Sequence, residues 1–530
     1  MQKFTEKQLF EILRLKYSEH LSSRVIAAHV GCSKSTINHF LRKETYPEFW
    51  EKYPENPAAG NNEPNHPKTG KFNKKRYVFT AAQNNTYVNK KFLASLEHYC
   101  AINDAELIVS TFFYNKSGFQ NGEGQKEVWY DPLIRPYIVN EKHEVFNGLV
   151  YCGELNILPT AVNPLSGFHG YTKDASAIIP HAKVQLMSIP VPKGATPKIL
   201  YTTGAVTKLN YIQQKAGQLA EFHHIYGALV AEVDDDGDWF VRHLIADKDG
   251  SFYDLDEYYT PDGLEEDSQH LAAVNWGDIH AEHIDQQVKF AAFDVKNPLN
   301  ILDTLKPEYQ LSHDTINFTA RSPHSFSDHY FRFGQFHHGT DAVEEDLKLC
   351  GNVMKEMLRP FSKLVVVNSN HDIHFKKWLS QADYKTDPVN AVFFLKCQLA
   401  IYEAIARGDK DFSIFEHSIK TMFPELANVR FLKQDEMFEI AGIEMGQHGH
   451  LGSNGSKGST SVYRKIGLRY NIGHQHSAGI LDGVYVAGTF SELDMGYNVG
   501  NSSWNHSCIL TYKNSKRTIV TIKNGKWRAW

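Results

Sequence analysis

Residues 271–280 read LAAVNWGDIH, an apolar run that ends in an aspartate and a histidine two positions apart. A short apolar run bounded by a turn is typical of a strand buried inside a sheet. An extended segment would put Asp278 and His280 on the same side, within reach of one ion. The stretch therefore predicts an α/β fold in which polar ligands follow the end of a strand.

The same arrangement recurs further along the chain. Apolar runs at residues 363–369 and 437–447 each lead into polar residues, and GHQH at 473–476 repeats the two-residue spacing. The polar residues delivered in this way are Asn370, His371, Asp372, His448, His474 and His476. Carboxylate and amide oxygens combined with imidazole nitrogens suit two adjacent ions such as Mn²⁺, Fe²⁺ or Zn²⁺. Two metals roughly 3.5–4 Å apart can clamp a phosphorus ester, which predicts a phosphoesterase.

In this order the motifs resemble the signature of the calcineurin-like metallophosphoesterase superfamily, which is D-x-H, G-D, G-N-H-[DE], a lone His and G-H-x-H. The resemblance covers about residues 271–510. It implies a two-sheet α/β/β/α sandwich, completed by antiparallel strands at 508–512 and 518–523. The G-D element is where the chain departs from the family. Asp314, in LSHDTIN, is the best candidate, and the alternatives are Asp294, Asp303 and Asp328.

Carried over to this chain, the resemblance implies two metal-binding sites. One ion would be held by Asp278, His280, Asp314 and His476. The second would share Asp314 and also be held by Asn370, His448 and His474. His371 would stabilise charge or protonate the leaving oxygen, with Asp372 orienting its ring. The implied cofactors are two divalent ions, Mn²⁺ first, with Mg²⁺, Fe²⁺ or Zn²⁺ as alternatives, and their shared water would be the nucleophile.

Residues 1–50 resemble a helix-turn-helix. Residues 6–17 have helical periodicity, with Leu9, Ile12 and Leu13 on one face, and Gly31 is placed for a left-handed turn between two further helices. The side chains expected to face outward, toward phosphates and base edges, are Lys34, Ser35, Asn38, His39 and Arg42. The alternative is a docking module with a solvated basic face.

The charge is unevenly distributed along the chain. Residues 1–76 carry 14 Lys and Arg against 8 Glu, a net charge of +6, whereas the remaining residues carry −11. A basic head on an acidic body predicts contact with a polyanion. Residues 51–76 read as a linker rich in Pro and Asn that ends in Lys74, Lys75 and Arg76. This linker would track a phosphate backbone or act only as a spacer.

Residues 77–268 are expected to form an accessory α/β domain, to which the sequence assigns no chemistry, and residues 269–530 the catalytic domain. The expected elements are a helix at 90–103 and strands at 77–81, 105–113, 182–186, 198–203 and 228–233. The acidic segment DDDGD at 234–238 lacks the glutamate of a Ca²⁺ loop and is expected to be a hairpin turn.

The sequence contains no apolar run long enough to span a membrane and no signal peptide at Met1, so we expect a cytoplasmic protein without a membrane segment. Its six cysteines are scattered, which favours reduced thiols over a disulfide framework.

The superfamily includes protein phosphatases, phosphodiesterases and nucleases, so the fold alone does not choose a substrate. The basic head favours DNA, and within the superfamily the chain is similar to the SbcD-type DNA nucleases. As a whole it resembles the early DNases of T-five-type coliphages. That resemblance implies a deoxyribonuclease that degrades host DNA early in infection, as a homo-oligomer in the bacterial cytoplasm. Two alternatives stay open: a phosphoesterase acting on a nucleotide or phosphoprotein, with the head used for assembly, and a DNA-binding regulator with a vestigial metal site.

Overall fold

The computed structural model describes residues 72–115, 128–265, 271–323 and 325–529, together with residues 4–13, 15, 26–27, 30–32, 36–37 and 40 of the head. Five expected DNA contacts lie outside the described residues, namely Lys34, Ser35, Asn38, His39 and Arg42. The linker up to residue 71 also lies outside them.

The head contains a small hydrophobic core. Helix α1 spans Glu6–Leu13, and its predicted inner face, which includes Ile12 and Leu13, is buried together with Ile37 and Phe40. Gly31 has a φ of +72°, so the predicted left-handed turn is confirmed.

A six-stranded sheet is the centre of residues 271–529. Its order is β16-β15-β14-β13-β22-β23, in which β13 to β16 run parallel and β22 and β23 form an antiparallel hairpin. The strands are β13 (Leu271–Asn275), β14 (Tyr309–Ser312), β15 (Lys363–Val366), β16 (Arg430–Phe431), β22 (Ser507–Tyr512) and β23 (Arg517–Thr521). The two C-terminal strands predicted from sequence are thereby confirmed.

A ten-stranded sheet has the order β17-β18-β19-β21-β20-β6-β7-β5-β4-β3. Its strands are β3 (Lys142–Phe146), β4 (Leu149–Cys152), β5 (Ser176–Ile179), β6 (Leu186–Ile189), β7 (Lys198–Thr202), β17 (Glu439–Ile440), β18 (Ile443–Glu444), β19 (Tyr470–Ile472), β20 (Gly479–Leu481) and β21 (Val484–Val486). Because β6 pairs with β20, this sheet is continuous across residue 268, where the sequence suggested a domain boundary.

A four-stranded sheet lies at the edge of the six-stranded one. Its order is β2-β1-β8-β9, built from β1 (Arg76–Gln83), β2 (Glu106–Phe112), β8 (Gly227–Val233) and β9 (Trp239–Ile245). The His243 N–H of β9 donates to the Thr518 hydroxyl of β23 at 3.1 Å. A three-stranded antiparallel sheet of β10 (Phe252–Asp254), β11 (Glu257–Thr260) and β12 (Gly263–Glu265) precedes β13 in the chain.

The two halves of the chain follow the same strand plan. Strand β1 pairs parallel with β2 and antiparallel with β8, as β13 pairs with β14 and β22. Strands β3 to β7 repeat the order and directions of β17 to β21. The later half differs mainly by carrying residues 313–438 where the earlier half has residues 113–141.

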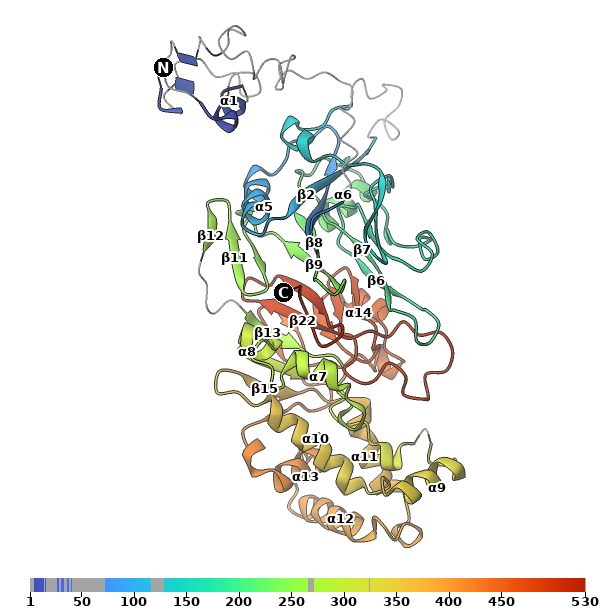
Figure 1. The fold of residues 1–530 in the computed structure, drawn as a ribbon. Helices are drawn as coiled ribbons and strands as arrows, with labels where there is room; N and C mark the ends of the chain where they lie inside the picture. Colours follow the sequence, from blue (N-terminus) through green and yellow to red (C-terminus); the bar gives the residue numbers. More distant parts are fainter. Residues whose placement is uncertain are drawn as a thin grey trace.

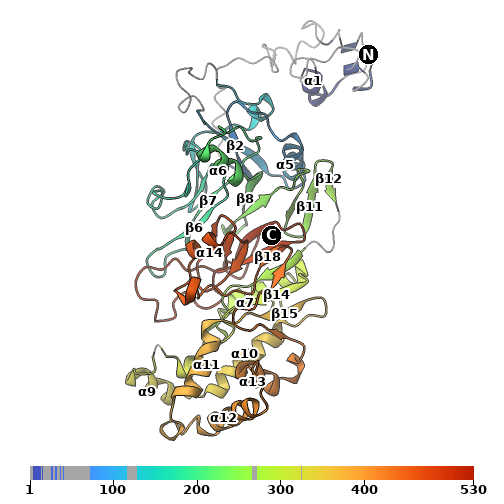
Figure 2. The ribbon, with the colours of Figure 1, turned by 180° about the vertical axis from the view of Figure 1, so that it is seen from behind.

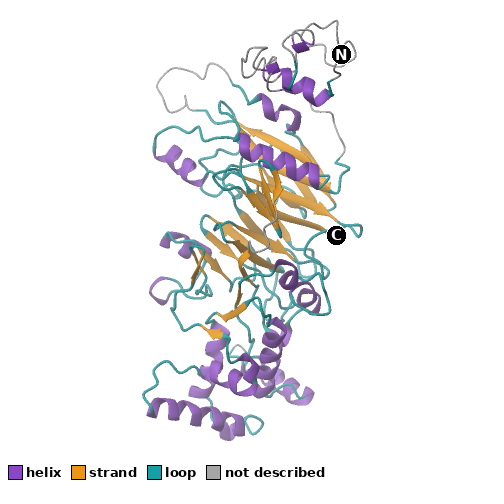
Figure 3. Cartoon of the chain, turned by 90° about the vertical axis from the view of Figure 1, so that its left-hand side faces the viewer, coloured by secondary structure: helices purple, strands orange, loops and turns teal. Residues whose placement is uncertain are grey.

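One face of the six-stranded sheet shares a hydrophobic core with helices α7 (Gln286–Ala292), α8 (Ile301–Leu305), α10 (Val343–Met357), α11 (Asn370–Gln381), α12 (Ala391–Ala406) and α13 (Ile414–Met422). Helix α9 (His329–His338) is mostly exposed, with Gln335 as its buried residue. Figures 1 and 2 show α9 to α13 gathered at one end of the molecule, and Figure 3 shows the strands filling its middle. In the rest of the chain lie α5 (Lys90–Ile102), α6 (Lys215–His223) and α14 (Thr460–Ile466).

Strand residues alternate between two cores, as the pleat requires. In β13, Val274 packs under the helices, whereas Ala273 packs between the sheets against Ile443 and Met445. A further core combines residues of both halves, including Tyr201, Ile480 and Ile509.

Two predicted strands were wrong in detail. The strand expected at 182–186 begins only at Leu186, because residues 182–185 form a bend and loop. The run 437–447 is not one strand but the hairpin of β17 and β18, which turns at Ala441 and Gly442, both at positive φ. The other predicted elements of residues 77–268 are confirmed, including the helix at 90–103 and the hairpin turn at 234–238.

Among the described helices, none is both long and apolar enough to cross a membrane. None of the six cysteines, all of which lie in the described residues, forms a disulfide.

Candidate metal centre

Neighbouring strands deliver the polar residues predicted from sequence. Asp278 follows β13, Asp314 follows β14, and Asn370 begins α11 just after β15. Since these parallel strands lie side by side, the residues after them meet at one edge of the sheet. The facing sheet supplies the remaining members after β18 and β19, which are His448, His474 and His476.

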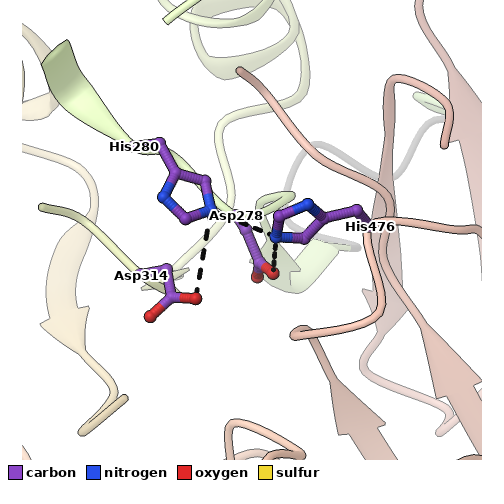
Figure 4. Close-up of side chains that lie close together, drawn as sticks. All are labelled: Asp278, His280, Asp314 and His476. Carbon is purple, nitrogen blue, oxygen red and sulfur yellow. Dashed lines mark hydrogen bonds and ion pairs between the residues drawn. The ribbon is translucent and has the colours of Figure 1, made fainter. Parts of the chain in front are cut away.

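Four of these residues form a first buried cluster (Figure 4). Asp278, His280, Asp314 and His476 each offer one ligand atom, and these atoms all lie within 4.8 Å of one another. The side chains of Asp278 and His280 are fully buried. Nε2 of His476 lies 3.0 Å from Oδ2 of Asp278, and Nε2 of His280 lies 4.0 Å from Oδ2 of Asp314.

A second cluster shares Asp314 with the first. It consists of Asp314, His448 and His474, again with ligand atoms within 4.8 Å of one another. Nε2 of His448 lies 3.1 Å from Oδ2 of Asp314 and 3.0 Å from Oδ1 of Asn370. Nδ1 of His474 lies 3.1 Å from the same Asn370 oxygen. Asp314 is thus placed between two sets of donors.

The donor set fits divalent cations. Nε2 of His280 and Nε2 of His476 lie only 3.1 Å apart, which calls for a proton or a cation between them. Both buried aspartates pair only with histidines, and no Lys or Arg of the described residues forms an ion pair with either. Because buried carboxylates without positive partners are costly, a cation would stabilise this arrangement.

Histidine protonation carries the compensating charge when no cation is present. Burial lowers the pKa of His448, but the carboxylates of Asp314 and Asp278 outweigh burial and raise it to about 9. Burial raises the pKa of the Asp278 carboxyl, but the nearby His448 and His476 outweigh this effect and lower the pKa to about 2. A metal ion would have to displace the His448 proton, since only neutral imidazole binds metals.

The imidazoles of His474 and His280 are already in the neutral form. Burial, followed by the charge of His448, lowers the pKa of His474 to about 4. Burial, followed by the charges of His371 and His476, lowers the pKa of His280 well below its usual value. These rings therefore meet the ligand requirement without losing a proton.

Four residues of the two clusters have left-handed backbone conformations. Their φ angles are +39° at Asp314, +45° at His280, +55° at His476 and +69° at His474. The extended geometry expected at Asp278 and His280 was therefore wrong, because the strand ends at Asn275. Such conformations cost about 1–3 kcal/mol each in non-glycine residues and gather at functional sites.

Gly473 lets two segments approach closely. A Cβ atom at Gly473 would lie 2.2 Å from Oδ1 of Asp278. The next N–H, that of His474, donates to Oδ2 of Asp278 at 2.7 Å. The glycine of GHQH is thus needed for the site to close.

His371 lies at the rim of the first cluster. Its ring centroid is 4.8 Å from that of His280, and its backbone N–H donates to Asp314 at 3.3 Å. Its Nδ1 donates to the Asn317 carbonyl at 2.8 Å. Asp372 instead accepts from the Ser369 N–H and hydroxyl and caps α11. Asn317 thus takes the place that the sequence analysis gave to Asp372 in orienting the ring.

Two buried acids hold the loop that contains Asn317. The Glu282 carboxylate accepts the backbone N–H groups of Asn317 and Phe318, each at 2.7 Å. Asp346 accepts the N–H of Ala320 at 2.7 Å. Burial raises the pKa of both acids, that of Asp346 to about 8 with a further contribution from Glu282.

The alternatives to Asp314 have other partners. Asp303 pairs with Arg359 at 2.6 Å, Asp328 caps α9, and Asp294 accepts the Lys296 N–H at 2.9 Å. Of the four candidate aspartates, only Asp314 belongs to the clusters.

The three linker cations pair with acidic residues of the body. Lys74 contacts Asp104 at 2.7 Å, Arg76 contacts buried Glu232 at 2.7 Å, and Lys75 contacts Asp235. Lys74, Lys75 and Arg76 lie apart from the two clusters, so the fold does not bring all of the predicted site residues together in one site.

Two aromatic neighbours of the ligands are not among the site residues predicted from the sequence. His450 packs against His448, with ring centroids 5.4 Å apart, and both its ring nitrogens are buried without a hydrogen-bond partner. It lines a small cleft together with Lys433, His448 and Tyr463. Trp504 packs on His476 with centroids 4.1 Å apart. The HGH spacing could have indicated His450, but nothing in the sequence indicated Trp504.

The described residues of the earlier half hold no such clusters at the matching positions. The Ala81 carbonyl accepts the Val206 N–H at 2.8 Å, as the Asp278 carbonyl accepts the Phe490 N–H at 2.7 Å. In the same way Ala182 matches His476, since their carbonyls accept the N–H groups of Ile225 and Asn505 at 3.0 and 3.1 Å. Ala81 and Ala182 pack with Phe112 and Ala205 in an apolar cluster.

Protein A1 of Escherichia phage T5 is similar to this chain, with 43% identity over 465 residues, which is 86% of this chain and 83% of the relative. The chain belongs to the protein A1 family. A match of that length extends over parts of both halves, so members of the protein A1 family share sequence beyond the two donor clusters. No protein-family profile and no solved structure matches the chain. A phage relative and a buried set of metal ligands are consistent with a metal-dependent enzyme.

Proposed function

We propose that this protein is a two-metal phosphodiesterase that hydrolyses DNA. The observation that carries the proposal is Asp314, which belongs to both buried donor clusters and so has the position of a ligand shared by two ions. The strand plan of residues 271–529 further supports the α/β/β/α sandwich of the metallophosphoesterases, with residues 269–530 as its catalytic domain.

The proposed ligands are Asp278, His280, Asp314 and His476 for one ion, and Asp314, Asn370, His448 and His474 for the other. When bound, the ions would neutralise phosphate charge and supply a hydroxide at neutral pH. Mixed carboxylate, amide and imidazole donors suit Mn²⁺, with Mg²⁺, Fe²⁺ and Zn²⁺ as alternatives.

His371 is the proposed general acid. Its Nδ1–H donates to the Asn317 carbonyl, so Nε2 is the ring atom that would give a proton to the leaving oxygen from the imidazolium form and leave the neutral ring with its proton on Nδ1. Asp372 contributes by capping α11, which begins one residue before His371.

DNA is the proposed substrate, in the cytoplasm of an infected bacterium. The relation to a phage protein and the +6 charge of residues 1–76 support it. A phosphoesterase for nucleotides or phosphoproteins is the alternative. A regulator with a vestigial metal site is disfavoured, because a degenerate site would not keep two complete donor sets buried together.

Self-association is proposed through helix α12. Its outer face exposes apolar side chains at the 3-4 spacing of a helix-pairing seam, namely Val392, Leu395, Leu399 and Tyr402, exposed by 47–67%. Lys396 and Glu403 flank this stripe at equal distances from the point between Leu399 and Ala400, where a two-fold axis can cross the helix. An antiparallel copy of α12 would therefore oppose Lys396 to Glu403, which favours a two-fold dimer.

The test is incubation of linear and closed-circular double-stranded DNA with the protein in Mn²⁺, Mg²⁺ or EDTA. Metal-dependent degradation that is lost in His371→Ala, but kept in the matched control His337→Ala on exposed α9, would support the proposal. The circular substrate separates internal from terminal cleavage. Intact DNA together with hydrolysis of a small chromogenic phosphodiester would favour the alternative enzyme. DNA binding without bound metal would favour the regulator.

A further inference from the structure

Two aromatic side chains, Tyr497 and Trp504, lie on the segment 491–505 beside the metal centre; we call them the aromatic platform. Trp504 packs edge-to-face on His476 with ring centroids 4.1 Å apart. Tyr497 packs edge-to-face on Trp504 at 5.9 Å and keeps 49% of its surface exposed. The platform thus runs from a proposed metal ligand out to solvent.

Tyr497 is within electrostatic reach of the clusters. Burial of its hydroxyl raises the pKa of Tyr497, and the carboxylates of Asp314 and Asp278 raise it further. An exposed ring this close to the buried carboxylates lies where a substrate bound at the ions would extend.

The earlier half of the chain holds the platform in place. Ser502 exchanges two backbone hydrogen bonds with Val191, both at 2.9 Å, and Lys193 pairs with Asp494 at 2.6 Å. Within the segment, the Asn498 side chain accepts the Met495 N–H at 3.0 Å and donates to the Leu493 carbonyl at 2.8 Å. A platform fixed in this way needs little ordering when a ligand binds.

The chemistry of the segment selects the kind of ligand. Residues 491–505 contain two acids, Glu492 and Asp494, and no Lys or Arg. They are therefore unsuited to phosphates, which require cationic or N–H donors. An aromatic face accepts a nucleobase without needing positive charge, because every base has a flat π-face.

We propose that Tyr497 and Trp504 stack the base of an unpaired nucleotide whose phosphate is held at the metal centre. The inference rests on the proposed function and narrows its substrate to single-stranded DNA or a frayed end. Bases within a duplex are stacked on one another and cannot reach such a platform without leaving the helix.

The first test compares two chromogenic phosphodiesters, one carrying a nucleoside and the other a methyl group in its place. The measured quantity is the ratio of kcat/KM for thymidine 5′-(4-nitrophenyl phosphate) to kcat/KM for methyl 4-nitrophenyl phosphate. Tyr497→Ala should lower this ratio by about tenfold, as expected for a lost base-stacking contact, whereas Tyr497→Phe should preserve it. The matched control is Tyr87→Ala, since Tyr87 is 62% exposed and packs on Trp129 at 5.1 Å, away from any donor cluster.

The outcomes separate this inference from the proposed function. If the unaltered protein hydrolyses neither substrate with Mn²⁺, the proposed function fails and the platform fails with it. If the unaltered protein hydrolyses both substrates and Tyr497→Ala leaves the kcat/KM ratio at the value of the Tyr87→Ala control, the platform proposal is wrong. The proposed phosphodiesterase function would then be retained.

A second measurement needs no turnover. Titrating the protein with oligothymidylate in EDTA should quench tryptophan fluorescence, because a stacked base quenches the indole beneath it. Trp504→Phe should remove the quench while keeping an aromatic ring against His476. A quench that persists in Trp504→Phe would assign the signal to another tryptophan and count against the platform.

Discussion

Nδ1 of His371 donates a hydrogen bond to the backbone carbonyl of Asn317 at 2.8 Å. A carbonyl can only accept, so this contact fixes which ring nitrogen carries the proton in the neutral imidazole. Nε2 is left for exchange with substrate, as the general acid proposed for this site requires.

Replacing His371 should separate chemistry from metal binding. His371→Ala is expected to lower kcat by about 10²–10⁴-fold, the usual contribution of a general acid, and to leave the metal content unchanged. Single-turnover rates and metal analysis of the same sample check both parts. A variant that loses its metal together with its activity would make His371 a ligand.

Glu282 should act as a positioning residue for His371. In Glu282→Gln the amide would oppose one of the N–H groups that the carboxylate now accepts, and the Asn317 carbonyl would shift. We expect kcat to fall by about 10–100-fold with little change in KM, as for other groups that orient a catalytic residue. Asp328→Asn, in the exposed cap of α9, is the control. A fall in the unfolding midpoint with unchanged kcat would mean that Glu282 is only structural.

Asp346 should make stability depend on pH. Burial and the Glu282 charge raise its pKa from 3.8 to about 8, while nearby Arg321 opposes this and exposed Glu345 adds to it. Between pH 4 and 8 the folded chain keeps a proton that the unfolded chain releases. The free energy of unfolding should therefore fall as pH rises through this window, by at most about 1.4 kcal/mol per unit.

Asp346→Asn should remove that component of the slope, because an amide does not titrate and its oxygen can still accept the Ala320 N–H. Urea unfolding between pH 5 and 8 measures the change, with Glu345→Gln as the neighbouring control. Equal slopes in the unaltered protein and Asp346→Asn would disprove the assignment.

Charge on the α12 stripe should break self-association. Leu399→Glu would bury a carboxylate in the proposed seam, so sedimentation velocity should show dissociation to monomers. Leu219→Glu is the control, since Leu219 is 47% exposed on α6. Lys396→Glu should weaken the assembly and Lys396→Glu with Glu403→Lys should restore it. An unaltered protein that sediments as a monomer would contradict the seam.

Removing residues 1–71 should weaken DNA binding. This deletion spares Arg76, whose pairing with buried Glu232 helps to hold β1. If the head contacts phosphates, the affinity should fall and its dependence on salt should flatten. An unchanged salt slope would assign the head to assembly instead.

Much of the candidate site could be predicted from sequence because its members follow strands. Asp278, Asp314 and Asn370 come after β13, β14 and β15, and neighbouring parallel strands bring such residues together. The pairing of β6 with β20 was not predictable, since it joins segments almost 300 residues apart through short strands with no distinctive pattern.

The finer geometry of the site depends on tertiary contacts that no local pattern encodes. His280 and His476 are left-handed because the loops close around buried carboxylates, whereas local preference would keep them extended. Asn317 orients His371 through its backbone carbonyl. Every residue has such a carbonyl, so the identity of residue 317 does not reveal this contact. Lys74 and Lys75 read as free cations until the fold brings Asp104 and Asp235 to them.

The alanines at 81 and 182 bear on the history of this gene. The two halves share one strand plan, but only the later half has acids and histidines at the matching positions. A tandem gene duplication leaves this pattern when one copy loses its functional site. Ala81 packs in an apolar cluster, whereas Asp278 belongs to a buried set of possible metal ligands. Homologous genes should therefore drift freely among small apolar residues at the first position and hardly at all at the second.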